Sequence, residues 1–429
     1  MKKYLKFITL ISMVGLLMIF MTSCFENVVN IVKNNSNTTD DTVTTDSSNN
    51  STTSYYPFVP SSRSSETTSS TNEETTTTTT SDTTLVKDEN GNIVQDEIIF
   101  DTTNELFLAQ KEELDLYIVD YKTLYGYQKL LEDRYYGEDF KNIYETLYNA
   151  SYNFLVSDKD YELTKLYNEE YLIIYEYKFE NYNYASVIAS AWITMIEENP
   201  MLYFSYTGYT LRQYGSGNNK YYTFCLLAGT DYKDSDDRYL YNEAILDMTE
   251  DFLDKYNNLE EKTDYNKAKL AHDYILNKVD YAYDNEGNAS EEYWAHNILG
   301  VALNKGSVCE SYAECYDYLS YLMDLNTLTV VGYSGTQSSG HAWNYTEIDG
   351  VWYGVDLTWD DGDTISYDYF LVSNKIMSKA HTPSDNSSYG IDYQVELPTL
   401  SSSSFDTSLD KEEPIIPSRP GIIRPRFWF

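Results

Sequence analysis

Residues 339–361 read SGHAWNYTEIDGVWYGVDLTWDD, and this stretch decides the fold of its surroundings. Asp349-Gly350 is a strong signal for a two-residue type I′ turn, and the residues on either side alternate between polar and apolar. The stretch therefore predicts an antiparallel hairpin over residues 341–358. A two-residue turn pairs Ile348 with Val351, and this pair fixes the register of every other pair in the hairpin.

This register gathers four side chains on one face. His341 faces Thr358 and Trp343 faces Asp356, and every second residue of a strand keeps its face. His341 and Asp356 become diagonal neighbours, close enough for a hydrogen bond between their side chains. A four-residue loop keeps this arrangement, whereas a three-residue loop breaks it. Taken singly, a structural histidine and a surface aspartate are the ordinary interpretation, but the shared face favours a functional pair.

The upstream segment Gly306-Ser-Val-Cys309-Glu-Ser-Tyr-Ala313 predicts the start of a helix over residues 308–323. Ser307 and Glu310 have the spacing of a capping box, with Ser307 as the N-cap. Cys309 then lies in the first turn, where unpaired backbone N–H groups and the helix dipole favour a thiolate. The flank nearest Cys309 carries residues at helical spacing that are predicted to pack inward: Tyr312, Tyr316, Leu319 and Met323.

The chain has four cysteines, Cys24, Cys225, Cys309 and Cys315, too few for a disulfide scaffold in 429 residues. A small buried apolar residue is the ordinary interpretation of a single cysteine, and it suits Cys315. Six helical residues rise about 9 Å, which exceeds the Cα separation of about 7 Å that a disulfide tolerates. Cys309 is therefore predicted to be a free thiol.

Together the hairpin and the helix supply the parts of a thiol enzyme. A thiol nucleophile needs a base, and the base needs an orienting acceptor. If the His341 face packs against the helix start, Cys309 is the nucleophile, His341 the base and later the acid, and Asp356 the orienting carboxylate. The backbone N–H of Cys309 offers one oxyanion donor. Weak candidates for a second donor, for which packing roles are equally open, are Trp294, His296 and Asn297.

The three motifs resemble those of the transglutaminase-like superfamily, in which a cysteine on a helix start precedes a histidine and an aspartate on successive strands. The resemblance covers about residues 265–383. It rests on Val308-Cys309-Glu-Ser-Tyr-Ala313, Gly340-His-Ala-Trp-Asn344 and Val355-Asp356-Leu-Thr-Trp-Asp-Asp361, and the stretch from Tyr369 to His381 resembles bacterial members. Ser311 is a departure, because many members carry glycine there.

The resemblance implies an α+β fold with a papain-like, transglutaminase-like core, in which the cysteine-bearing helix packs on an antiparallel sheet. It also implies a catalytic triad of Cys309, His341 and Asp356. Members of the family carry out amide cross-linking, deamidation or peptide hydrolysis, and some have no catalytic activity. Some eukaryotic members use calcium, and whether this chain needs it stays open.

Five segments are predicted along the chain. Residues 1–24 are interpreted as a lipoprotein signal peptide and residues 25–84 as a Ser/Thr-rich disordered tether. Residues 85–260 are predicted to be a mainly helical, Tyr-rich region that includes a β-hairpin. Residues 261–393 form the transglutaminase-like catalytic domain, and residues 394–429 a disordered Ser/Pro-rich tail.

Within the N-terminal region, a small hairpin is predicted from Val86 to Val94, around an Asn-Gly turn. Residues 103–198 are predicted to be mainly helical, and the helix Ala185–Glu198 stops before a proline. Two strands are predicted at 201–214 and 220–229. Further helices are predicted at 242–258 and 264–279.

The first 24 residues have the features of a targeting segment. Lysines precede an apolar run from Phe7 to Met21, which at about 22 Å is shorter than the ~30 Å hydrocarbon core of a bilayer. The run therefore indicates a signal sequence. Met21-Thr-Ser-Cys24 resembles a bacterial lipobox, so Cys24 is the expected lipidation site, and an ordinary secretory signal is the alternative. Lipidation predicts an extracytoplasmic protein anchored to a cell membrane.

Composition excludes several functions. Thirty Lys+Arg against 68 Asp+Glu give a formal net charge of −38, which disfavours nucleic acid as a partner. The sequence has no P-loop, dinucleotide fingerprint or EF-hand loop, and we expect no cofactor and no metal. The remaining histidines, which do not have the spacing of a ligand set and are expected to be structural or exposed, are His272, His296 and His381.

Two functions remain. The first is a surface-anchored thiol enzyme that acts on amide bonds of a protein or peptide substrate through a Cys309 thioester, resolved by water or by an amine. The second is a non-catalytic adhesion, scaffold or binding lipoprotein that retains the fold, which the long tether and the Tyr-rich region suit. The complete triad favours the enzyme. The sequence does not indicate an oligomeric state.

Overall fold

The computed structural model describes residues 54–56, 85–89, 91–100, 102–166, 169–204, 208–335, 339–384 and 395–406. The predicted signal peptide with Cys24, most of the predicted tether and the tail beyond residue 406 lie outside these ranges. No helix within them is both long enough and apolar enough to cross a membrane.

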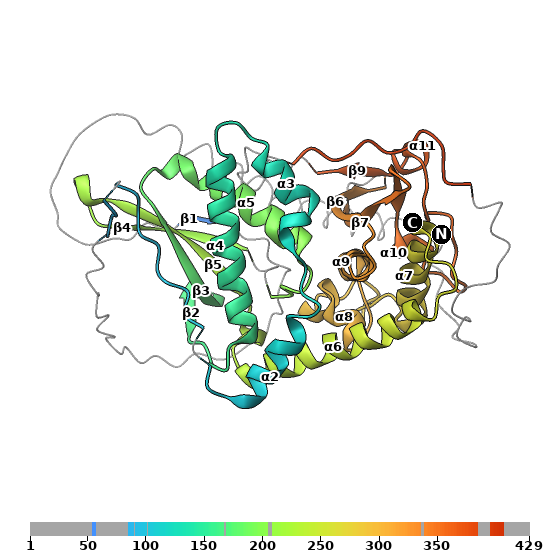
Figure 1. The fold of residues 1–429 in the computed structure, drawn as a ribbon, viewed down its shortest axis with the longest axis horizontal. Helices are drawn as coiled ribbons and strands as arrows, with labels where there is room; N and C mark the ends of the chain where they lie inside the picture. Colours follow the sequence, from blue (N-terminus) through green and yellow to red (C-terminus); the bar gives the residue numbers. More distant parts are fainter. Residues whose placement is uncertain are drawn as a thin grey trace, which may run out of the picture. The chain divides into compact units, whose positions relative to one another are not determined.

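The N-terminal region pairs a five-stranded antiparallel sheet with helices (Figure 1). The strand order is β1-β4-β5-β3-β2, with β3 and β4 flanking the fully buried strand β5. The strands are β1 Ser54–Tyr56, β2 Leu163–Leu166, β3 Glu169–Phe179, β4 Tyr209–Tyr214 and β5 Tyr221–Ala228. The helices are α2 Glu105–Leu114, α3 Tyr125–Leu131, α4 Gly137–Val156, α5 Ala185–Glu198 and α6 Ser235–Asn257.

The second sheet carries the three motifs. Its strands run antiparallel in the order β8-β7-β6-β9, and α9 packs against β7 and β6 (Figure 1). The strands are β6 Thr327–Ser334, β7 Ser339–Ile348, β8 Val351–Val355 and β9 His381–Pro383. The helices are α7 Asp264–Lys278, α8 Leu299–Ala302, α9 Cys309–Tyr321, α10 Leu357–Asp360 and α11 Asn374–Met377.

The hairpin of β7 and β8 has the predicted turn and register. Ile348 pairs with Val351, and Asp349 and Gly350 have φ angles of 52° and 81°, the positive values that a type I′ turn requires. Pairing stops after Asn344↔Val355, so the predicted pairs that involve residues 356 and 358 are wrong. The chain leaves the ladder because the next residue, an aspartate, caps α10 instead.

Helix α9 begins close to the predicted residue but with a different cap. Its N-cap is Val308, which makes no side-chain capping bond, so the predicted capping box is wrong. The Ser307 hydroxyl instead hydrogen-bonds the Ser311 hydroxyl at 2.9 Å, and Glu310 turns to His296. The predicted inward face is confirmed by its burial, with exposures of 1% or less at Tyr312, Tyr316, Leu319 and Met323.

The serine that departs from the family pattern fits the helix start. Ser311 is fully buried against the close approach of α8 and α9. A Cβ at Gly300 would lie 2.7 Å from the Ser311 hydroxyl oxygen and 2.4 Å from the carbonyl oxygen of Gly306. Glycine at position 300 therefore leaves the room that the serine pair at 307 and 311 occupies.

The N-terminal region holds more strand than the sequence predicts. Helix α5 has the predicted bounds, and the small hairpin is confirmed by the antiparallel bridge Lys87↔Ile93. Residues 103–198 are mainly helical, as predicted, but the sequence analysis did not predict β2 and β3 within them. The β3 segment is rich in aromatic and β-branched residues, which favour strands. The strand predicted at 201–214 begins only at Tyr209.

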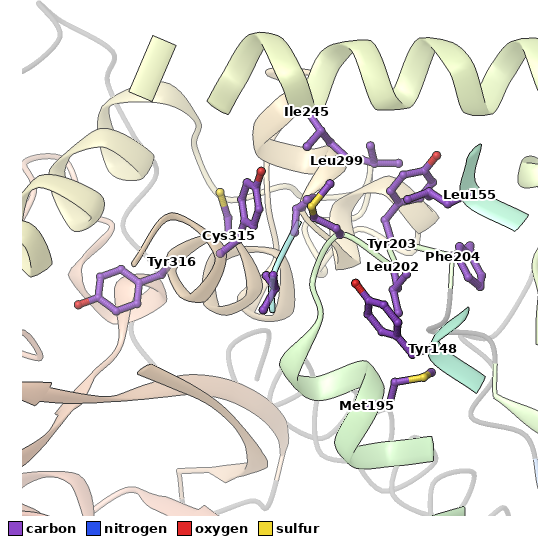
Figure 2. Packing of buried hydrophobic residues seen from close by; sticks show 14 of the residues in the cluster. Tyr148, Leu155, Met195, Leu202, Tyr203, Phe204, Ile245, Leu299, Cys315 and Tyr316 are labelled. Atoms are coloured by element: carbon purple, nitrogen blue, oxygen red, sulfur yellow. The ribbon is translucent and has the colours of Figure 1, made fainter. Parts of the chain in front are cut away.

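One hydrophobic core runs through both regions. Figure 2 shows Cys315 and Tyr316 on α9, with Ile245 of α6 and Leu299 of α8 packed nearby. Cys315 has no exposed surface, as predicted, and its sulfur lies 3.8 Å from that of Met248. The predicted boundary near residue 260 falls between α6 and α7, and both helices contribute to this core.

Part of the predicted disordered tail packs on the second sheet. Residues 395–406 follow the edge strand β8, where Leu400 forms a parallel bridge with Trp352. The backbone N–H of Phe405 donates to the carbonyl of Leu371 at 3.0 Å, and the Phe405 ring stacks on Tyr265. The prediction that the tail begins at 394 is therefore wrong for these residues, because their apolar side chains find places in the core.

Candidate active site

Cys309 is the first residue of α9 and is partly exposed, as the predicted nucleophile must be. It is a free cysteine, as predicted, while Cys225 and Cys315 are buried. Its position places the thiol beside backbone N–H groups that have no acceptor within the helix. Burial raises the pKa of the Cys225 thiol to about 12. Cys309 differs from the two buried cysteines in its access to solvent and reagents.

His341 and Asp356 meet as predicted, but through a different local structure. His341 Nε2 donates to Asp356 Oδ2 at 2.8 Å. Asp356 is the N-cap of α10, and its Oδ1 accepts the backbone N–H of Trp359 at 3.2 Å. The Asp356 backbone N–H in turn donates to the carbonyl of Tyr369 at 3.0 Å. The cap, rather than a pair in the ladder, therefore directs the carboxylate toward the imidazole.

The neighbouring groups of the site shift the pKa values of His341 and Asp356 in opposite directions. Burial alone would lower the pKa of His341, but the Asp356 carboxylate, together with a hydrogen bond to Cys309 and its charge, raises that pKa to about 10. Burial would raise the pKa of Asp356, but the charge of His341 and hydrogen bonds from His341 and His381 lower it to about 2. The site thus favours an imidazolium at His341, held by the Asp356 carboxylate and in contact with Cys309.

The geometry brings the three predicted residues together. The His341 ring contacts Cys309 on α9, and its Nε2 is held by Asp356. Nδ1 is therefore the ring nitrogen left for the thiol. The helix start, the strand β7 and the cap of α10 each supply one group, and such an arrangement can form and discharge a thioester.

His381 is a site residue that the sequence analysis did not identify. It lies on the edge strand β9, and its Nε2 donates to the same Asp356 Oδ2, also at 2.8 Å. It is only 4% exposed, so of the two expectations for this residue, structural or exposed, the second is wrong. The stretch of resemblance that ends at His381 was the available signal, but the spacing of the histidines did not link it to the triad.

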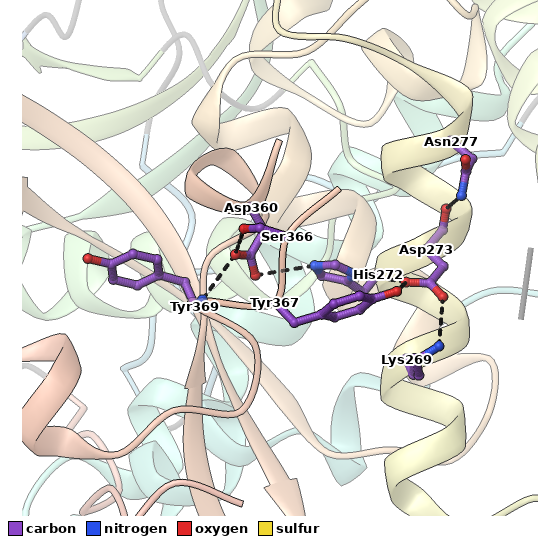
Figure 3. Close-up of polar contacts among 8 residues, drawn as sticks. All are labelled: Lys269, His272, Asp273, Asn277, Asp360, Ser366, Tyr367 and Tyr369. Carbon is purple, nitrogen blue, oxygen red and sulfur yellow. Dashed lines mark hydrogen bonds and ion pairs between the residues drawn. The ribbon is translucent and has the colours of Figure 1, made fainter. Parts of the chain in front are cut away.

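A second buried polar cluster holds the chain segment of Asp356 (Figure 3). One turn after Asp356, Asp360 accepts from the Ser366 hydroxyl at 2.7 Å and from the Tyr369 N–H at 3.0 Å. His272 of α7 lies between Asp360 and Asp273, at 3.4 and 3.1 Å. Burial lowers the pKa of His272, but hydrogen bonds to these two carboxylates outweigh it and raise that pKa.

The candidates for a second oxyanion donor have different surroundings. The Asn297 amide donates to the carbonyl of Tyr293 at 2.9 Å and to the Tyr232 hydroxyl at 3.3 Å, so neither of its N–H groups is left for an oxyanion. Trp294 packs with Val308, the residue before the nucleophile, and its role as a donor stays a prediction. His296 binds Glu310 and the carbonyl of Ser290.

In the described ranges, one group of three candidate metal ligands occurs, formed by His341, Asp356 and His381. Their ligand atoms lie within 4.8 Å of one another. Both Nε2 atoms already lie at hydrogen-bond distance from one carboxylate oxygen, which satisfies all three without an ion. We therefore interpret the group as part of the Cys309 site.

Part of the chain is similar in sequence to known proteins. No family model matches the chain. The kyphoscoliosis peptidase of Homo sapiens is 26% identical over 134 residues, which are 28% of this chain and 20% of the relative. The Mus musculus protein of the same name is 24% identical over 152 residues, 33% of this chain and 21% of the relative. The matched part spans about a fifth of the length of these relatives.

The ordered cysteine, histidine and aspartate motifs, joined in one site, agree with this match. The chain is thus similar to these peptidases over 28–33% of its length. The predicted α+β, transglutaminase-like fold class is confirmed, with a cysteine-bearing helix on an antiparallel sheet.

Two solved structures have local similarity to part of the chain. A structure described as a TGase matches 34% of this chain and 43% of its own, with 17% identity and a TM-score of 0.23. A candidate cysteine protease from Cytophaga hutchinsonii matches 34% of this chain and 61% of its own, with 14% identity and a TM-score of 0.21.

Proposed function

We propose that this protein is a thiol enzyme that acts on amide bonds of proteins or peptides through a thioester at Cys309. The observation that carries the proposal is the chain of contacts from Cys309 to His341 and from His341 Nε2 to Asp356 Oδ2 at 2.8 Å. Each of the three groups has the chemical type that its role requires. The similarity to peptidases over part of the chain supports a thiol enzyme, and the amide substrate is our inference from the triad.

In the first half-reaction, the Cys309 thiolate attacks the carbonyl carbon of a carboxamide or peptide bond, and a C–S bond forms. The negative charge moves to the carbonyl oxygen, where the N–H of Cys309 at the helix start offers one donor. The His341 imidazolium gives its proton to the leaving amine as the C–N bond breaks. Asp356 stabilises the imidazolium and fixes the tautomer of the neutral imidazole that remains after the proton has left.

In the second half-reaction, the neutral His341 removes a proton from water or from a primary amine, which attacks the thioester. The C–S bond breaks, and the thiolate and the imidazolium are restored. Water yields a carboxylic acid and an amine yields a new amide, so the two outcomes differ only in the nucleophile that reaches the thioester. Cleft shape and exclusion of water decide between them.

We also propose that the enzyme is held on the outer face of a cell membrane through a lipid at Cys24. The apolar run that ends at this cysteine and the long polar segment after it support the anchor. Metabolic labelling with a fatty-acid analogue tests it. Label on the wild type but not on Cys24→Ser supports the anchor, and label on neither contradicts it.

Competitive labelling with iodoacetamide, read by mass spectrometry, tests the nucleophile. Cys309 should react much faster than Cys225 and Cys315, because it alone contacts an imidazolium and is partly exposed. Equal rates in the folded protein would favour the non-catalytic scaffold. Cys309→Ala should abolish turnover and leave the melting temperature nearly unchanged, whereas Cys315→Ala, at a buried position, should keep turnover.

A glutamine-containing protein offered together with a fluorescent primary amine separates the possible reactions. Fluorescence in the protein indicates amine transfer, new fragments indicate peptide cleavage, and a mass increase of about 1 Da at glutamine indicates deamidation. Each product should disappear with Cys309→Ala. A product that persists in that variant would contradict the assignment of the nucleophile.

A further inference from the structure

We propose that His381 is a positioning residue, a second imidazole that holds Asp356 in place for His341 by donating to the same carboxylate oxygen. The inference rests on the proposed function, since it assigns a role within the same site. It extends the triad to a fourth group, which the chain supplies from the edge strand β9.

Two hydrogen bonds of equal length meet at one oxygen. Asp356 Oδ2 accepts from Nε2 of His341 and from Nε2 of His381, each at 2.8 Å. The carboxylate has no exposed surface, so water does not replace either donor. Its other oxygen accepts the N–H of Trp359 at 3.2 Å. The carboxylate is therefore fixed at both oxygens, and its rotation away from His341 would break three bonds.

The surroundings of His381 make it a donor in one tautomer. Its ring lies 4.5 Å from that of Trp359, 5.0 Å from that of Trp343 and 5.7 Å from that of Tyr369, measured between ring centroids. Its Nδ1 is buried and has no hydrogen-bond partner among the described residues. A proton on Nδ1 would be buried without an acceptor, which is costly. The proton therefore stays on Nε2, where the carboxylate accepts it.

The packing of the second sheet brings β9 close to Asp356. His381 pairs with Ser334 of β6, and the N–H of Gly335 donates to the carbonyl of Ala380 at 2.8 Å. A Cβ at Gly332 would lie 2.2 Å from the carbonyl oxygen of Thr382 and 2.8 Å from the Trp343 ring. Only glycine at this position lets β9 and the indole close together, and this closure carries His381 to Asp356.

The matched variants His381→Gln and His381→Phe separate hydrogen bonding from packing. Glutamine places an amide N–H near the position of Nε2 and keeps the donor, whereas phenylalanine keeps a ring among the aromatic neighbours and removes the donor. The readout is the rate of Cys309 alkylation by iodoacetamide at fixed pH, with and without EDTA, alongside the melting temperature. Should the Phe variant fail to fold, His381→Leu replaces it.

The Phe variant should react at least tenfold more slowly than the wild type, because a hydrogen bond to a charged group is lost, while the Gln variant should stay within about threefold. Equal rates in the Phe variant and the wild type, or a Gln variant as slow as the Phe variant, would overturn the proposal. So would a wild-type rate that changes with EDTA, since the group would then hold an ion.

This experiment keeps the two proposals apart. An activated Cys309 in the wild type, with no difference between the Gln and Phe variants, overturns the role of His381 alone. A Cys309 that reacts no faster than Cys225 and Cys315 in the wild type overturns the proposed function together with it.

Discussion

Replacing Asp356 by asparagine is the sharpest perturbation of this site, because it removes one charge and almost no volume. Asparagine is as good an N-cap as aspartate, so the start of α10 should survive. The amide cannot stabilise an imidazolium as a carboxylate does, and its NH₂ group offers no acceptor to Nε2 of His341. The change therefore tests the charge of the orienting group separately from its shape.

The magnitude follows from the pKa of His341. The span from 6.5 to about 10, at about 1.4 kcal/mol per pH unit, corresponds to about 5 kcal/mol of preference for the imidazolium. Burial opposes this preference, and of the groups that raise the pKa Asp356 acts most strongly, ahead of Cys309. A hydrogen bond to a charged group contributes about 1.5–3 kcal/mol, so loss of the Asp356 charge should lower the reactivity of Cys309 by about tenfold to a hundredfold.

Iodoacetamide alkylation of Cys309 at pH 6 measures that fraction, because only the thiolate reacts. Asp356→Asn should lower the rate by up to about a hundredfold. Asp368→Asn, the same change at an exposed carboxylate in the same part of the chain, should leave it unchanged. A folded Asp356→Asn protein that alkylates within threefold of the wild type would refute the reasoning.

The same pair predicts how stability depends on pH. The contribution of His341, whose pKa is raised from 6.5 to about 10, is fully present below pH 6.5 and is lost as the pH rises through about 10. The contribution of Asp356, whose pKa is lowered from 3.8 to about 2, is present above pH 3.8 and is lost as the pH falls through about 2. Between pH 3.8 and 6.5 the free energies of unfolding of the wild type and Asp356→Asn should differ most, and a constant difference up to pH 10 would contradict this.

Three further variants probe the scaffold of the site. Gly332→Ala should push β9 outward, lower the free energy of unfolding by about 1–3 kcal/mol and slow alkylation of the nucleophile; an unchanged alkylation rate would count against the close packing. His272→Leu should cost about 3–5 kcal/mol in urea denaturation, since Asp273 and Asp360 lose the cation between them, and a loss below about 1 kcal/mol would speak against a charged His272. Gly350→Ala should cost about 1–2 kcal/mol at its positive φ with no change in alkylation, and a drop in the alkylation rate would show that the turn itself shapes the site.

The predictable part of the site is the part with local signals. A two-residue turn fixed the hairpin register, and the capping-box spacing of Ser307 and Glu310 located the start of α9 to within about one residue, although the box itself does not form. The contact of His341 with Asp356 was predicted from a ladder pair, whereas the structure makes it through an N-cap, so the neighbours were right and the local structure was not. His381 lies 25 residues beyond Asp356 and reaches it only through the pairing of β9 with β6, for which a short edge strand leaves no pattern.

For the fold, too, elements with a local sequence signal were predicted and elements without one were not. Helix α5 was predicted to the residue, since its apolar positions recur at helical spacing and a proline follows. Strand β3 was missed because both of its faces are largely covered. Its apolar residues therefore do not alternate with polar ones at a period of two. Residues 395–406 were assigned to a disordered tail because serine and proline dominate the C-terminal segment, while a few apolar anchors, Leu400 and Phe405 among them, decide where the chain packs.

The thiol and its imidazole come from separate elements, a helix start and a strand, and they meet only when α9 has docked on the second sheet. Before that, during synthesis, the cysteine is an ordinary thiol with no base beside it. Reactivity therefore depends on this docking, and a copy in which α9 has not docked lacks the base that activates its thiol.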